Sequence, residues 1–135
     1  MAQVLVVEDD DDIRRGLTLA LGDAGFEVIE AETGDAASWL MEIEHPELLL
    51  AGMHIRGRYN GVSLATLTRT RHPGLPVLFV MNRPGDIKHM ADFAQPFAAV
   101  ARPCLLAEIV AAAQRLVSRG GRRTPVARLG MTPSP

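Results

Sequence analysis

Carboxylates gather directly after the first apolar run of the sequence. The run VLVV, residues 4–7, is followed at once by EDDDD, residues 8–12. Carboxylate oxygens are the ligands that hard cations such as Mg²⁺ prefer. A metal position at Glu8 and Asp9 and a purely structural acid cluster are therefore equally good interpretations. Residues 10–12 suit a solvated loop and the start of a helix, where the helix dipole favours negative charge.

Two further side chains could do chemistry, but their surroundings favour structural roles. His54 lies in the stretch HIRGRYNG, residues 54–61, without a second metal-ligand motif nearby, so we expect a loop histidine. Cys104 is the single cysteine, which excludes an internal disulfide and a multi-cysteine zinc site. We expect it to pack at the start of the last helix.

Motifs of cofactor-dependent enzymes are missing from the sequence. No glycine-rich phosphate loop follows the first apolar run, so a dinucleotide cofactor has no cradle. With one Trp, one Tyr and no Ser/Thr-rich loop at that place, a flavin site is a poor alternative. We therefore expect a protein that is not an enzyme.

Apolar runs that suit buried strands alternate along the chain with stretches of helical periodicity. Strands are predicted at residues 4–7, 26–31, 48–52, 77–81 and 97–101. Helices are predicted from Asp11 or Asp12 to Gly25, from Thr33 or Asp35 to Pro46, over 61–72, weakly within 82–96, and over 102–117. This alternation predicts an α/β fold with a single doubly wound, five-stranded parallel sheet and five helices.

The fold brings distant residues to one edge. Ligands of such sheets bind at the carboxyl ends of the strands. The residues expected to converge there are Glu8, Asp9, Gly52, Met81 and Arg102.

Composition predicts one globular domain of residues 1–118 and a disordered basic tail of residues 119–135. All 16 acidic residues lie within residues 1–117, whereas residues 118–135 carry four of the 14 Lys and Arg. The 47% of hydrophobic residues with only 4% aromatics suits an aliphatic core and does not favour nucleic-acid binding. The sequence shows neither a membrane span nor a signal peptide, so we expect a soluble, cytoplasmic protein.

Four segments carry a resemblance to a known family. VLVVEDDDDIRRGL, PELLLAG, PVLFVMN and VARPCLLAEI, in this order and spacing, resemble the receiver domain of bacterial two-component response regulators over about residues 3–118. The resemblance implies a flavodoxin-like sheet with strand order 2-1-3-4-5. It also implies a phosphoryl-transfer site with an acidic pair that binds Mg²⁺, an acceptor aspartate, a Thr or Ser, and a Lys before Pro.

The resemblance breaks down at that site. Glu8 and Asp9 match the acidic pair, but Gly52 occupies the place of the acceptor aspartate that ends the third strand. Met81 replaces the hydroxyl residue, and Arg102 replaces the lysine. We therefore expect a degenerate receiver in which Mg²⁺ binding at Glu8 and Asp9 is vestigial and weak.

Arg102 suggests what replaces the metal. A guanidinium at the end of the fifth strand can reach Glu8 or Asp9 and pair with it bidentately. This pair would do permanently what metal and lysine do together in an active receiver, and it predicts that Arg102→Ala destabilises the fold.

The expected function is a phosphorylation-independent protein-interaction module of two-component signalling. By analogy with the family, the face of the fourth helix, fifth strand and fifth helix would bind a histidine kinase, a hybrid kinase or another regulator, or form a homodimer. Direct DNA binding and membrane binding are not expected. Candidate residues of this surface are Ile87, Met90, Phe93 and Ala99, the last standing where the family often has an aromatic switch residue. The alternative is a functional receiver with a non-standard acceptor, such as Asp10, Asp86 or a histidine.

Overall fold

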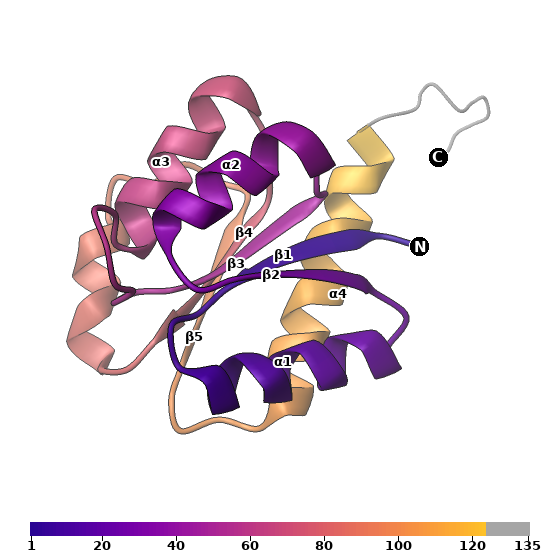
Figure 1. Cartoon of the computed structure of the whole chain (residues 1–135), viewed down its shortest axis with the longest axis horizontal. Helices are drawn as coiled ribbons and strands as arrows, with labels where there is room; N and C mark the ends of the chain where they lie inside the picture. The colour runs from indigo at the N-terminus through magenta and orange to yellow at the C-terminus, as the bar shows by residue number, and fades with distance from the viewer. Residues whose placement is uncertain (124–135) are drawn as a thin grey trace.

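The structure is a computed structural model that describes residues 1–123 (Figure 1). Five strands alternate with five helical segments. Their order along the chain is β1 (Gln3–Val7), α1 (Asp11–Asp23), β2 (Glu27–Ala31), α2 (Gly34–Glu44), β3 (Leu48–Gly52), α3 (Gly61–Arg71), β4 (Val77–Met81), η1 (Pro84–Met90), β5 (Phe97–Ala101) and α4 (Leu106–Arg123).

All strand pairs are parallel, and the strand order is β2-β1-β3-β4-β5, which confirms the predicted topology. The continuously apolar runs of β3 and β4 lie in the middle of the sheet and are fully buried. β2 lies at one edge of the sheet, where Glu27 and Glu30 are exposed. The entirely apolar β5 lies at the other edge, so the hydrophobic pattern alone does not decide which strands are central.

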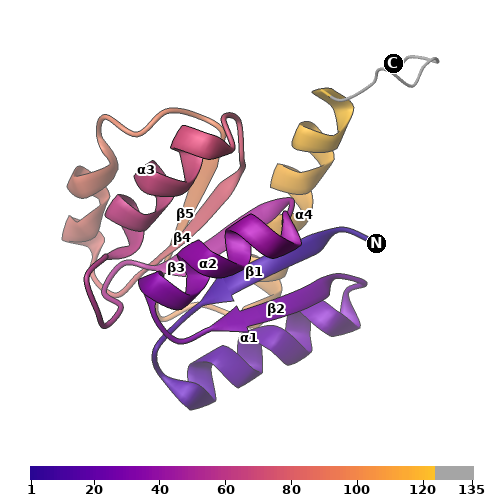
Figure 2. The same cartoon turned by 45° about the horizontal axis from the view of Figure 1, so that its top comes forward.

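Helices cover both faces of the sheet (Figures 1 and 2). A hydrophobic core lies on each face. On one face, α2 and α3 contribute Ala37, Met41 and Leu64 to the first core. On the other face, α1 and α4 contribute Leu17 and Leu116 to the second. Right-handed crossovers between parallel strands place successive helices in this way.

Helix starts are fixed by polar side chains. Asp10 caps α1 by accepting a hydrogen bond from the Ile13 N–H at 3.0 Å, so the cap is Asp10 rather than the predicted Asp11 or Asp12. Thr33 caps α2 as predicted. Such a side-chain oxygen satisfies an amide that has no partner within the helix.

Two helices differ from their predicted form. The weak fourth helix is a 3-10 helix, η1, because Pro84 and Gly85 stand at its start. The last helix, α4, continues to Arg123, so the predicted domain boundary at residue 118 lies within it. Residues 124–135 of the predicted tail lie outside the described residues.

Within residues 1–123, no helix combines the length and the apolar content that crossing a bilayer requires.

Candidate functional site

Glu8 and Arg102 form an ion pair across the carboxyl edge of the sheet. Glu8 follows β1 and is only 7% exposed, and Arg102 follows β5. The Arg102 Nη2 donates to Glu8 Oε1 at 3.3 Å. The predicted pairing is present, but through one nitrogen rather than bidentately.

The missing side chain at Gly52 leaves space beside the Glu8 carboxylate. In the sheet, β3 and β4 lie between β1 and β5, so the pair spans three strand spacings, roughly 14 Å between backbones. A Cβ at Gly52 would lie 3.1 Å from Glu8 Oε1 and 3.6 Å from a methyl carbon of Ile55. The Glu8 carboxylate therefore borders the space that an acceptor side chain at residue 52 would enter.

Burial and hydrogen bonding have opposite effects on the pKa of Glu8. Burial is the largest effect and raises the pKa of Glu8, while the Asp10 N–H, which donates to Oε2 at 3.0 Å, and the Arg102 charge lower it. The net pKa lies above the ordinary value for glutamate. Because burial dominates, the ionised carboxylate depends on its two partners.

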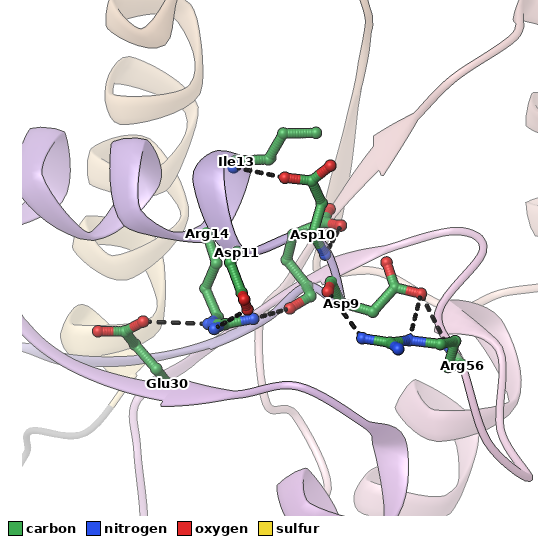
Figure 3. Close-up of polar contacts among 8 residues, drawn as sticks. Asp9, Asp10, Asp11, Ile13, Arg14, Glu30 and Arg56 are labelled. Atoms are coloured by element: carbon green, nitrogen blue, oxygen red, sulfur yellow. Dashed lines mark hydrogen bonds and ion pairs between the residues drawn. The ribbon is translucent and has the colours of Figure 1, made fainter.

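Asp9 has its own arginine, which the sequence analysis missed. The Arg56 N–H donates to Asp9 Oδ2 at 3.0 Å, and its Nη2 donates to the Asp9 carbonyl oxygen at 3.0 Å (Figure 3). The Arg56 Nε also lies 3.5 Å from Asp9 Oδ2. These contacts hold the loop between β3 and α3 against the start of α1.

A third arginine fixes the backbone of the acidic segment. Arg14 of α1 donates to the Glu8 carbonyl oxygen at 2.7 Å, to Asp11 at 2.6 Å and to Glu30 at 3.1 Å. Figure 3 shows its guanidinium between Asp11 and Glu30. The hydrogen bond that Arg14 donates to Asp11 is the largest cause that raises the pKa of Arg14. Three of the five carboxylates of residues 8–12, those of Glu8, Asp9 and Asp11, are therefore each paired with an arginine.

Met81 gives the site no polar group. It ends β4, is 6% exposed and packs in the first core. Its carbonyl oxygen accepts a hydrogen bond from the Arg102 N–H at 2.8 Å, which anchors the start of the loop after β5.

The residues at this edge do not fit a Mg²⁺ site. The Glu8 carboxylate is bound to Arg102, the Asp9 carboxylate is bound to Arg56, and Gly52 supplies no oxygen ligand from a side chain. Across residues 1–123, no group of three or more Asp, Glu, His or Cys side chains is placed to hold a metal ion. A hard cation requires several oxygen ligands, and here the available carboxylates already face cations.

The predicted alternative acceptors have structural roles. Asp86 is buried and accepts hydrogen bonds from the Asn82 and Arg83 N–H groups at 3.3 Å, and His54 Nε2 lies 3.4 Å from its other oxygen. Burial raises the pKa of Asp86, but these hydrogen bonds outweigh it and lower the pKa below its ordinary value. Asp10 is the helix cap.

Cys104 is half-buried near the start of α4. Burial raises the pKa of its thiol, and Glu108 adds to the effect, so the thiolate is disfavoured.

The predicted interaction surface is largely turned inward. Ile87 is 52% exposed, whereas Met90 is 2% exposed and belongs to the first core, so Met90 as a surface residue was wrong. Phe93 and Ala99 are partly buried against the same core. Phe93 packs its ring edge-on against Phe79 at 5.2 Å between centroids, which explains its inward position.

Comparisons with known proteins agree with this architecture. Residues 4–113 match the family model of the response regulator receiver domain. The receiver protein CpdR of Brucella abortus is 32% identical over 80 residues, which cover 59% of this chain and 66% of that protein. The transcriptional regulator NtrC of Salmonella typhimurium is 31% identical over 117 residues, which cover 85% of this chain and 24% of that protein. The chain thus spans less than two thirds of either relative.

A solved structure shows the same fold. A receiver domain protein from Clostridium thermocellum superimposes with a TM-score of 0.84, covering 92% of this chain and 100% of that chain at 16% identity. The strand order, the acidic segment after β1 and the family match over residues 4–113 lead to one conclusion. The chain belongs to the response regulator receiver domain family of two-component signalling.

Proposed function

We propose that this receiver works as a protein-interaction module that does not depend on phosphorylation. The observation that carries the proposal is the Glu8 carboxylate, held by Arg102 beside the space where residue 52 has no side chain. A receiver of the active type needs a nucleophilic carboxylate there and a metal to neutralise the incoming phosphoryl group. Gly52 removes the nucleophile, and the arginines already supply the positive charge.

The partners follow from the family and remain part of the proposal. A histidine kinase, a hybrid kinase or another regulator would bind the protein surface, and the protein would catalyse no reaction and require no cofactor. Because the match to the DNA-binding regulator NtrC covers only 24% of that protein, we do not carry DNA binding over to this chain. The output would pass through the bound partner.

The test is treatment with a small-molecule phosphodonor and Mg²⁺, followed by intact mass measurement. We expect no acid-labile mass increase, while a receiver with an intact acceptor aspartate gains one phosphoryl group under the same conditions. An adduct that fragmentation places on Asp10, Asp86 or a histidine would instead establish a non-standard acceptor and overturn the proposal.

A further inference from the structure

An aromatic groove lies between α2 and α3, away from the acidic edge residues. Its volume is about 430 Å³. The two helices lie side by side over the same face of the sheet (Figure 2). The groove is lined by Asp35, Ser38, Trp39, Met41, Glu42, Tyr59, Leu67, Thr68 and Arg71.

Helix α2 exposes two large apolar side chains, of which Trp39 lines the groove. Trp39, the single tryptophan of the chain, is 64% exposed, and Ile43, one helical turn later on α2, is 51% exposed. Residues four apart lie on the same side of a helix, so the two form one ridge. Trp and Tyr are the side chains that most often dominate binding energy at protein interfaces.

The charge on α2 has one sign. This helix carries Asp35, Glu42 and Glu44 and neither Lys nor Arg. The groove itself holds Asp35 and Glu42, and its single lining arginine, Arg71, is paired with Glu42 at 2.8 Å. A partner that places positive charge here would meet the Asp35 carboxylate, and the ring of Trp39 offers a face for a guanidinium.

We propose that the groove between α2 and α3 binds a basic, apolar-anchored helical segment of a partner protein, with Trp39 as the main contact. The inference rests on the proposed interaction role, because it names a surface and the chemistry of the partner. Apolar side chains such as leucine would fill the groove between Trp39 and Tyr59, and an arginine would face Asp35.

Other occupants fit the charges less well. A second copy of the chain would bring two α2 surfaces together, and α2 carries acidic residues without Lys or Arg, so like charges would meet. A membrane surface is anionic and would be repelled for the same reason.

The experiment uses a dye-labelled synthetic amphipathic helix with leucines on one face and arginines beside them. Its matched control has glutamate in place of each arginine. Fluorescence anisotropy measures binding to the full chain, and the emission of Trp39 reports contact at the groove. We expect saturable binding of the arginine peptide, weakened about tenfold or more in the glutamate peptide.

Protein variants locate the site. Trp39→Ala should weaken binding about tenfold or more, whereas Leu19→Ala, which removes a 63% exposed leucine from α1, should change it less than about twofold. Asp35→Asn should weaken binding about two- to threefold and reduce its salt dependence. Circular dichroism verifies that each variant is folded.

Three results would overturn the inference. They are absent binding of the arginine peptide, equal binding of both peptides, and a Trp39→Ala variant that binds normally. A dimer that dissociates on Trp39→Ala would assign the groove to a second copy instead. If the peptide experiment fails and the phosphodonor experiment yields no phosphoryl adduct, the proposed function stands, because only such an adduct contradicts it.

Discussion

Replacing Arg102 by alanine tests the ion pair that closes the site. Glu8 is 7% exposed, so the substitution leaves a buried carboxylate without its cation. At an effective dielectric constant of about 20, two charges about 4 Å apart attract by about 4 kcal/mol. Desolvation and the partial exposure of Arg102 offset most of this energy. We expect a net loss of about 1.5 kcal/mol at pH 7, or about 6 °C in Tm.

The loss should depend on pH, and its sign follows from Glu8. Because burial raises the pKa of Glu8 above its unfolded value, the folded chain holds more protons, and Glu8 makes stability fall as pH rises above about 4.5. Arg102 lowers that pKa, so the variant loses more stability over the same rise. Below about pH 4, Glu8 is protonated in both states, and most of the difference disappears.

Urea unfolding followed by Trp39 emission, at pH 4 and at pH 7, measures both quantities. Arg115→Ala is the matched control, because Arg115 is exposed on α4, and it should change the free energy of unfolding by less than about 0.5 kcal/mol. An Arg102→Ala variant as stable as the wild type at pH 7, or equally destabilised at both pH values, would refute the reasoning.

Three further substitutions probe the same edge. In a Glu8→Gln background, Arg102→Ala should lower the free energy of unfolding at pH 7 much less than it does in the wild type. A double-mutant cycle that gives no coupling energy would contradict the ion pair. Gly61→Ala should lower the free energy of unfolding by about 2 kcal/mol or more, because its Cβ would overlap the Gly52 carbonyl oxygen. The control Gly16→Ala, in open space on α1, should raise that free energy by about 0.5 kcal/mol. Equal urea midpoints for these two variants would contradict the close packing at Gly61. Gly52→Asp should lower Tm at pH 7 by about 4 °C, because the new carboxylate crowds Glu8. Millimolar MgCl₂ should restore part of this Tm and leave the Tm of the wild type unchanged. If MgCl₂ does not change the Tm of Gly52→Asp, residue 52 does not provide a new metal ligand.

The sheet was predictable because its signals are local. Apolar runs such as LLLAG mark strands, and Thr33 or Pro46 marks a helix end, so the order of elements follows from short windows of sequence. The form of η1 and the length of α4 were less predictable, because helix ends depend on weak, competing preferences. Met90 was misplaced since a short helix with little periodicity does not show which side faces the core.

Within the site, only the residues at or directly after strand ends were predictable. Gly52 ends β3, and Glu8 and Arg102 directly follow β1 and β5, so the parallel sheet brings these residues to one edge whatever the loops do. Arg56 lies in a loop and contacts Asp9, which is 47 positions away in the sequence. The conformation of this loop follows no sequence periodicity, so the contact could not be predicted.

The central claim is that arginines permanently hold the Glu8 and Asp9 carboxylates, so that this edge responds neither to Mg²⁺ nor to a phosphoryl group. Amide NMR spectra of the full chain, recorded during titration with MgCl₂ and then with beryllofluoride as a phosphoryl mimic, test it most directly. The account predicts that the amides of Asp9, Asp10, Gly52 and Met53 shift no more than in KCl of equal ionic strength. Saturable shifts of these amides with Mg²⁺ or beryllofluoride would contradict it.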